Sequence, residues 1–424
     1  MNHTVSEVTL KNGLKGLILH VPDAPVISVE VSFRAGEFLL AREKWETAHI
    51  MEHLMLGANR SFRSSRLFQA ELEKNGAYSN ASTSAYDIGY EVECAAFESE
   101  RVLQLLVSAL ESPVFLASEF KAESGNVAEE LESRSNNHFR TLNLALRENL
   151  GFYGVSDSER VDLMKNVSLQ DIKDHYASTH SNANARFVIA GNITKAHTDI
   201  LESMNLQSVC GRKQMPQELP KHLSEPILIK RSDVPNLYFY IDTYAPRLLT
   251  LKERDALSVL TTLLTETLHS QLLGAAREKG LVYAMGSGQQ HLKSSSSFWL
   301  GAQVSKKNAA PLFDLMQTVL SHIKKDGVSK QDLEAAKQYM EGRHARSAQT
   351  VTGLLGKYTH EYYMDDTVAQ QQKYVECIRA VTAQDVSNAL QLVCSGEWAL
   401  GILGNMTQKA ANDLYTKTDH MLHL

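Results

Sequence analysis

Alternating hydrophobic and polar positions dominate the first hundred residues. Residues 14–21 (LKGLILHV) and 26–33 (VISVEVSF) follow the two-residue period of half-buried strands, and residues 78–94 (YSNASTSAYDIGYEVEC) continue the sheet pattern. Residues 99–112 (SERVLQLLVSALES) and 118–134 (SEFKAESGNVAEELESR) are typical of helices instead. Strands mixed with helices in this way predict an α+β fold, with helices packed on a mainly antiparallel sheet.

One short pattern occurs twice in the chain. Residues 167–172 (VSLQDI) and then 187–194 (FVIAGNIT) correspond to 381–386 (VTAQDV) and then 398–407 (WALGILGNMT). The glutamines of the two copies are offset by 384 − 170 = 214 positions and the asparagines by 405 − 192 = 213. Each copy reads as a Ser/Thr N-cap, an amphipathic helix and an apolar strand that ends in a Gly-Asn turn. The shared order and offset predict two homologous domains that arose by internal duplication.

The length of the chain agrees with this duplication. A chain of 424 residues suits two domains of about 200 residues each. The polar segment 211–226 holds three prolines, a composition typical of a linker. We therefore expect an N-terminal catalytic domain at 1–210 and a C-terminal homologous domain at 227–424.

Composition excludes several classes of protein. Hydrophobic residues make up 43% and charged residues 22%, as in ordinary globular proteins, and the net charge of −6 argues against nucleic-acid binding. The four cysteines are far apart, which favours reduced thiols in a cytosol-like compartment. We expect a soluble, cytoplasmic protein with no membrane contact, because no secretory or transit pattern and no apolar run of transmembrane length is visible. A mature protein already stripped of its signal would look the same.

The segment TAHIMEHLMLG, residues 47–57, carries the candidate chemistry. On a helix, His49 and His53 lie one turn apart on the same face, and Glu52 lies on the same side. Imidazole nitrogen and carboxylate oxygen are ligands that zinc accepts, and a catalytic zinc site keeps one position open for water. A nearby unligated carboxylate can accept a proton from that water. Taken alone, the motif is also compatible with a pair of surface histidines beside a glutamate.

A third metal ligand has to come from elsewhere in the sequence. The predicted helix 118–134, with Ser118 as its expected N-cap, contains four glutamates. Glu123 and Glu130 are seven residues apart and share a face, whereas Glu129 and Glu132 point elsewhere and are expected to be solvated. The shared face therefore supplies the candidates for the missing ligand.

At this point the chain resembles a known family. HIMEH, followed after 76 residues by Glu130, is similar to the inverted zinc-peptidase signature H-x-x-E-H of the pitrilysin, insulin-degrading enzyme and mitochondrial processing peptidase family. Residues 10–37 resemble its opening strands, residues 75–93 its Gly-x-x-Asn-Ala-x-Thr edge strand, and residues 277–287 (REKGLVYAMGS) its Arg- and Tyr-bearing segment. The resemblance is to the short, two-domain type of this family.

The resemblance implies specific roles at the metal. His49, His53 and Glu130 would bind one zinc ion per chain, and Glu52 would be the general base that activates water. Glu123 would support the ligands from outside the coordination sphere. The chain would then be a zinc metalloendopeptidase that hydrolyses peptides or unfolded segments.

The resemblance also implies a substrate-binding set. Asn80 and Ala81 would bind the backbone of an extended peptide that adds itself to a sheet edge. Arg277 would hold substrate carbonyls, and Tyr283 would donate a hydrogen bond to the oxyanion. Without the family match, these two would more simply be an exposed helix-end cation and a packed strand residue. Shifted by about 213 residues, the metal motif falls on 262–266, where no H-x-x-E-H occurs, so the second domain would lack the metal.

The family resemblance leaves the assembly open. A two-domain chain would complete an enclosed chamber by pairing, and we expect a homodimer in which each metal faces the Arg and Tyr of the other subunit, with a heterodimer as the alternative. A non-catalytic or partner-dependent subunit with a structural role is the alternative function, and a purely structural zinc site is a weaker one. The chain departs from the family at residues 43–49 (EKWETAH), where glycine and small residues are usual, and at residues 56–59 (LGAN).

Overall fold

The computed structural model describes residues 1–206 and 208–423, which form two compact units. The first unit comprises Met1–Ser133, Asp157–Pro216 and Ala345–Val368, and the second comprises Arg134–Ser156, Gln217–His344 and Ala369–Leu424. Whereas the sequence suggested two continuous domains, each unit includes a short stretch from the other half of the chain. The segment 211–226, expected to be a linker, carries neither helix nor strand and is divided between the units at Pro216.

The first unit is built on a six-stranded sheet with the order β1-β2-β6-β3-β5-β4. The β2–β6 pair is parallel and the other pairs are antiparallel. The strand predicted at 26–33 is confirmed at both ends, and the stretch 78–94 forms two strands joined by a turn. The strands are β1 (Thr4–Thr9), β2 (Lys15–His20), β3 (Val26–Phe33), β4 (Tyr78–Thr83), β5 (Ile88–Ala95) and β6 (Ala185–Gly191).

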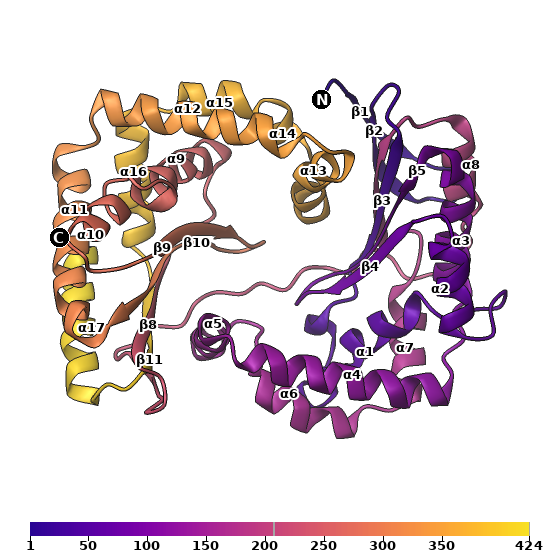
Figure 1. Ribbon diagram of the computed structural model, residues 1–424, viewed down its shortest axis with the longest axis horizontal. Coiled ribbons are helices and arrows are strands. Elements are labelled where there is room, and N and C mark those ends of the chain that lie inside the picture. Colours follow the sequence, from indigo (N-terminus) through magenta and orange to yellow (C-terminus); the bar gives the residue numbers. More distant parts are fainter. Residues whose placement is uncertain (207, 424) are drawn as a thin grey trace. The chain divides into compact units, whose positions relative to one another are not determined.

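Helices cover both faces of this sheet. In Figure 1, α3 and α8 lie along one face and α13 lies along the other, in agreement with the contacts of α3 with β5 and of α13 with β3 and β6. The helix predicted at 118–134 begins at Ala117, so the expected N-cap at Ser118 is wrong: Ser118 lies within the first turn. The helices of this unit are α1 (Thr47–Met55), α2 (Ser65–Glu73), α3 (Ser99–Glu111), α4 (Ala117–Ser135), α6 (Asp157–Leu163), α7 (Leu169–Thr179), α8 (Lys195–Ser203) and α13 (Val351–Asp365), with short 3-10 turns at Glu37–Leu39, Arg42–Lys44, Ala96–Glu98 and Met164–Asn166.

Because both faces are covered, the central strand β6 is buried along its whole length. Phe187 and Ile189 point into the larger core, while Val188 and Ala190 pack against the residues of α13. A strand buried on both faces has no polar side to present, which explains why FVIAG is continuously apolar rather than alternating.

The second unit repeats the arrangement. Its five strands have the order β7-β11-β8-β10-β9, which matches β2-β6-β3-β5-β4 strand for strand, and β7–β11 is again the parallel pair. The predicted fold class, two homologous α+β domains with mainly antiparallel sheets, is therefore confirmed. The strands are β7 (Ile227–Lys230), β8 (Asn236–Tyr244), β9 (Met285–His291), β10 (Ser296–Ser305) and β11 (Trp398–Gly404).

The helices of the second unit surround its own hydrophobic core. No helix among the described residues is both long enough and apolar enough to cross a membrane. The helices are α5 (His138–Leu150), α9 (Leu251–Thr261) followed by a π-helical turn (Thr262–Glu266), α10 (Leu273–Glu278), α11 (Ala309–Asp326), α12 (Lys330–Ser347), α14 (Ala369–Gln372), α15 (Tyr374–Ala380), α16 (Ala383–Cys394) and α17 (Gln408–His423), with a 3-10 turn at Lys306–Asn308.

The two halves of the chain exchange one helix each. The α5 helix comes from the N-terminal half but packs on β8 and β11, and α13 comes from the C-terminal half but packs on β3 and β6. These helices begin at His138 and Val351, an offset of 351 − 138 = 213 that equals the sequence repeat. A Cβ atom at Gly401 of β11 would lie 2.8 Å from the Leu142 side chain of α5, so any larger residue there would have to displace the leucines of this helix.

The repeated N-cap pattern is also present in both halves. Ser168 begins α7 with a capping box to Asp171, and Thr382 begins α16 with a capping box to Asp385. In each box the side-chain oxygen accepts from the third helical N–H while the aspartate accepts from the cap N–H. The predicted duplication thus extends from strand order to individual hydrogen bonds.

Candidate metal centre

Helix α1 presents two histidines and a glutamate beside the core of the first unit. Its apolar side chains, including Ile50, Met51 and Leu54, are buried in that core and fix the rotation of the helix. The remaining face carries His49, Glu52 and His53, whose side chains are 4%, 11% and 22% exposed. The sequence folds in this way because the apolar positions recur at helical spacing around the polar ones.

Helix α4 brings a carboxylate to the two imidazoles. The Oε2 atom of Glu130 lies 3.5 Å from Nε2 of His49 and 3.4 Å from Nε2 of His53. Tetrahedral ligands at about 2.0–2.2 Å from a metal are separated from one another by about 3.3–3.6 Å. The spacing of these donor atoms therefore fits a zinc-sized ion held by two nitrogens and one oxygen.

Glu52 lies beside this set but in a different position. Its Oε2 is 4.0 Å from Nε2 of His49 and accepts a hydrogen bond of 3.2 Å from the Thr83 hydroxyl. The donor atoms of His49, Glu52 and His53 lie within 4.8 Å of one another, which makes Glu52 an alternative third ligand. Glu130 fits the geometry of a third ligand better than Glu52, because both of its distances match a tetrahedral edge and that of Glu52 to His49 is longer.

The environment of Glu52 shifts the pKa of its carboxyl upward. Burial raises the pKa of this carboxyl above its ordinary value, and the neighbouring His53 and His49 side chains oppose the rise. A carboxylate whose pKa lies closer to neutrality is better suited to accept a proton and then return it.

Each histidine has a carboxylate behind it. His49 Nδ1 lies 3.1 Å from Oε2 of Glu46, and His53 Nδ1 lies 3.1 Å from Oε2 of Glu123. A carboxylate can only accept, so a hydrogen bond at either contact requires a proton on Nδ1, the tautomer that leaves the Nε2 lone pair for another ligand. The carboxylate behind His53 is 29% exposed, whereas that behind His49 is fully buried.

The buried Glu46 is held by an arginine from α6. Arg160 donates through Nε to one Glu46 oxygen and through Nη2 to the other, 3.1 Å away, and it also contacts Glu37 at 2.9 Å. Burial works to raise the pKa of Glu46, but the hydrogen bond with His49 and the charge of Arg160 outweigh it and leave that pKa below its ordinary value. Burial raises the pKa of Glu37, because Arg160 compensates only in part.

The predicted peptide-binding residues lie on the edge of the first sheet. Asn80 and Ala81 belong to β4, which pairs with β5 and is the last strand in the sheet order of the described residues. Asn80 is exposed and Ala81 is half-buried. Thr83, at the end of the same strand, contacts Glu52, so this edge leads directly to the candidate metal centre.

Arg277 and Tyr283 lie in the second unit and contact each other. The Arg277 guanidinium donates to the Tyr283 carbonyl and lies 5.1 Å from the centre of the tyrosine ring, at a cation–π distance. The Tyr283 side chain is 85% exposed. Tyr283 also lines a hollow of about 700 Å³ together with Tyr240 and Trp299. Of the two simpler alternatives, the exposed helix-end arginine is seen, since Arg277 lies in the last turn of α10, but Tyr283 is not a packed strand residue, because it is exposed and precedes β9.

The second unit has no counterpart of the metal motif at the corresponding position. Thr262 donates its hydroxyl to the Ser258 carbonyl, and Glu266 forms an ion pair with Arg343. Among the residues that the structure describes, the grouping of metal-ligand side chains lies on α1.

Comparison with known proteins places the chain in a family. Residues 17–151 match the family described as "Insulinase (Peptidase family M16)", and residues 166–340 match "Peptidase M16 inactive domain". The chain belongs to peptidase family M16. The expected resemblance to the insulin-degrading and mitochondrial processing peptidases is thereby confirmed, and the range matched to the inactive domain, 166–340, does not include the motif at residues 49–53.

Individual M16 relatives match between 48% and 95% of the chain. "Zinc protease PqqE" of Helicobacter pylori is 24% identical over 388 residues, which span 87% of this chain and 86% of that protein. A solved protease from H. pylori superposes with a TM-score of 0.83 at 20% identity, covering 95% of this chain and all of the other. "Mitochondrial-processing peptidase subunit beta" of Rattus norvegicus is 24% identical over 231 residues, 48% of this chain and 46% of that protein.

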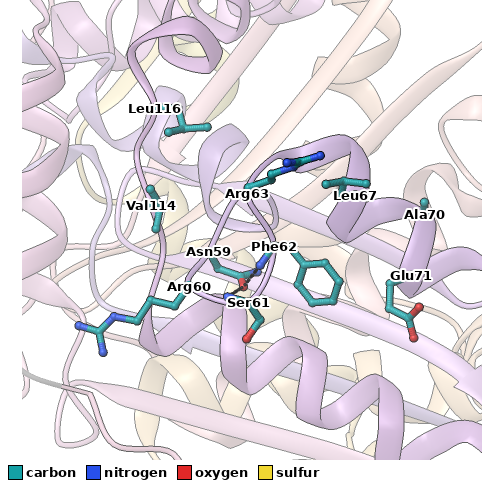
Figure 2. A pocket seen from close by; sticks show the side chains of 10 residues that line it. All are labelled: Asn59, Arg60, Ser61, Phe62, Arg63, Leu67, Ala70, Glu71, Val114 and Leu116. Atoms are coloured by element: carbon teal, nitrogen blue, oxygen red, sulfur yellow. Dashed lines mark hydrogen bonds between the residues drawn. The ribbon is translucent and has the colours of Figure 1, made fainter.

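A separate hollow of about 760 Å³ lies in the first unit of this M16 chain, between the loop before α2 and the segment before α4. Figure 2 shows Arg60 and Arg63 extending in different directions from that loop, with Phe62 and Leu67 nearby. Its lining residues include none of the predicted site residues, so this hollow is distinct from the candidate metal centre.

The sequence interpretation missed three residues of the centre: Glu46, Arg160 and Thr83. Glu46 could have been found, because it precedes His49 by three positions and replaces a residue that is usually small. Arg160 could not have been found in this way, since it is 114 positions from Glu46 and carries no motif of its own.

Proposed function

We propose that this chain is a zinc-dependent endopeptidase that cleaves peptides or unfolded segments bound in extended form. The observation that carries the proposal is the position of Glu130 Oε2, 3.5 and 3.4 Å from the two imidazole Nε2 atoms, with Glu52 beside them. His49, His53 and Glu130 would hold one zinc ion per chain. Membership in the M16 family, together with a 24% identical zinc protease, supports this assignment.

The side chains divide the work of hydrolysis. Zinc, when bound, supplies a Lewis acid that polarises a carbonyl and makes water more acidic. Glu52 accepts the proton of the attacking water and passes it to the leaving amine as the peptide bond breaks. Thr83 holds the Glu52 carboxylate through its hydroxyl, and Glu123 and Glu46 hold the two imidazoles.

The substrate would bind along the edge of β4. An extended peptide can add itself to a sheet edge through main-chain hydrogen bonds, at Asn80 and Ala81 in this chain. Such binding reads the backbone more than the side chains, so the cleavage preference would be broad. Because Thr83 ends the same strand and touches Glu52, a peptide running along β4 would pass the general base.

The test is peptide cleavage by the purified protein, with a matched pair of variants. Glu52→Gln should lower the cleavage rate by about 10²–10⁴-fold and leave zinc content unchanged, because it removes only the proton acceptor. Glu129→Gln makes the same chemical change at an exposed position on α4 and should cleave at the wild-type rate. Cleavage by Glu52→Gln at the wild-type rate would contradict the assigned base.

We further propose a homodimer in which Arg277 and Tyr283 of one subunit complete the centre of the other. The exposure of Tyr283 supports this, since a side chain that is 85% exposed is free to meet a ligand from outside its own unit. Mixing Glu52→Gln with Tyr283→Phe subunits tests it. Half of the dimers would be hybrids with one intact site of two, so about a quarter of wild-type activity should return. No recovery in a confirmed hybrid would contradict a shared site.

A partner-dependent subunit is the second candidate. The observation that favours it is the match over 231 residues to a protein named as a subunit of the mitochondrial processing peptidase. Such a subunit would bind zinc but cleave peptides only after a non-identical partner is added.

We place the protein in a reducing, cytoplasm-like compartment on the basis of its four free cysteines, Cys94, Cys210, Cys377 and Cys394.

A further inference from the structure

Glu46 is the most deeply buried ionisable group at the candidate metal centre. Its side chain is 0% exposed, and its Oε2 lies 3.1 Å from Nδ1 of His49. It lies at the N-terminal end of α1, directly before the first helical residue.

Glu46 is itself fixed by a network that involves no metal ligand. Arg160 of α6 contacts both of its oxygens and also Glu37, and all three side chains are at least nine-tenths buried. A buried carboxylate without a partner is costly, and a planar guanidinium in this geometry holds the carboxylate in one orientation. The network therefore supplies a rigid acceptor aimed at a single nitrogen of His49.

We propose that Glu46 is a positioning residue: held by Arg160, it keeps the proton of His49 on Nδ1 and leaves Nε2 free to bind the metal. This inference rests on the zinc site of the proposed function. A neutral imidazole has one protonated nitrogen and one free nitrogen. The group that accepts a hydrogen bond from the protonated nitrogen therefore decides which nitrogen can bind a metal. Because a carboxylate only accepts, Glu46 permits one tautomer.

The partner of His53 differs in a way that can be measured. Glu123 is 29% exposed, so water can replace it as the acceptor at Nδ1 if it is removed. Glu46 has no contact with bulk water, and its loss cannot be repaired in this way. Metal affinity should thus depend more strongly on Glu46 than on Glu123.

The experiment compares zinc affinity in Glu46→Gln and Glu37→Gln. A glutamine at 46 keeps the size of the side chain but can present either an oxygen or an N–H to Nδ1, so it no longer specifies the tautomer. Glu37→Gln is the matched control, because it removes a carboxylate from the same Arg160 without touching His49. Zinc dissociation constants are measured by competition with a chromophoric chelator, alongside the melting temperature of each metal-free protein.

Glu46→Gln should weaken zinc binding by about 10–100-fold, the usual effect of losing an outer hydrogen-bond partner, while Glu37→Gln and wild type differ by less than about threefold. The absorption bands of bound Co²⁺ should shift in Glu46→Gln alone, since they report ligand geometry. Equal weakening by both variants, or none by Glu46→Gln, would overturn the inference. If the wild-type protein binds no zinc, the proposed function itself fails.

A second measurement uses the unsubstituted protein and so does not depend on the folding of a variant. Histidine nitrogen NMR of the zinc-loaded protein, with His49 assigned by comparison with His49→Gln, should show a proton on Nδ1 of His49. A proton on Nε2 of His49 would overturn the inference.

Discussion

The two units of this protein share a strand order but differ in what surrounds one corresponding segment. In the first unit, residues 47–55 form a helix whose histidines are backed by carboxylates. In the second unit, the segment 213 positions later lies where α9 ends in a π-helical turn, Thr262–Glu266. There a hydroxyl bonds to its own helix and a glutamate pairs with Arg343.

This difference separates the requirements of the fold from those of the site. The strand order, the parallel pair and the capping boxes are the same in both units, so they do not depend on metal-ligand chemistry. The first unit adds a buried ionic network, Glu37–Arg160–Glu46, behind one histidine. Burying such charges costs free energy. We interpret that cost as the requirement for holding the imidazole of His49 in position.

The largest expected effect comes from removing a metal ligand of the first unit. The corresponding residue of the second unit serves as the control. His49→Ala should weaken zinc binding by more than the roughly 10–100-fold that follows loss of an outer partner, because it deletes a donor atom. Thr262→Ala, 213 positions later, should leave zinc affinity unchanged. Zinc content after dialysis and chelator competition measure both. Loss of zinc in Thr262→Ala would mean that the second unit also takes part in binding.

Sequence patterns predicted the parts of the fold that depend on local order. The strand at 26–33, the duplication and the N-caps at Ser168 and Thr382 follow from short-range periodicity and hydrogen bonding. The exchange of α5 and α13 was not predicted, because a buried helix face does not say which sheet will cover it. The N-cap of α4 was predicted at Ser118, two residues late, since the helix begins at Ala117 and a serine can be accommodated inside the first turn as well as before it.

The second prediction tests the helix exchange with another pair of corresponding residues. Leu142 of α5 and Leu355 of α13 are 0% and 2% exposed, and 355 − 142 = 213. Each leucine-to-alanine change should cost about 2–5 kcal/mol in the free energy of unfolding, because each leaves a cavity against a sheet. Denaturant unfolding gives the size of the effect.

The location of the effect is more informative than its size. Hydrogen exchange should quicken in β8 and β11 for Leu142→Ala and in β3 and β6 for Leu355→Ala, although each mutated residue belongs to the other half of the sequence. Faster exchange confined to the half of the sequence that carries the substitution would contradict the exchange of helices between the units.

The smallest expected effect contrasts two aspartates: Asp87, half-buried in the turn between β4 and β5, and Asp242, buried in β8. Burial raises the pKa of Asp242 in β8 to about 7 and that of Asp87 to about 6, from 3.8. Asp87 lies 3.6 Å from Arg34, whereas Asp242 accepts its hydrogen bond from the Tyr244 hydroxyl at 2.8 Å. The ionised form is therefore balanced by a cation in the first unit and mainly by hydroxyl groups in the second.

This contrast fixes the sign of a pH dependence. Between pH 3.8 and about 7 the folded protein binds more protons at Asp242 than the unfolded chain does, so stability from this group falls as pH rises through that window. Asp242→Asn should therefore stabilise the protein at pH 8 by about 1–3 kcal/mol and flatten the decline between pH 4 and 7. Asp87→Asn should give a smaller gain at pH 8, because Arg34 opposes the effect of burial and the window of falling stability ends at about pH 6 rather than about 7. Urea unfolding at pH 5 and pH 8 measures both, and a gain for Asp87→Asn as large as that for Asp242→Asn would mean that the ion pair in the first unit does not make the difference.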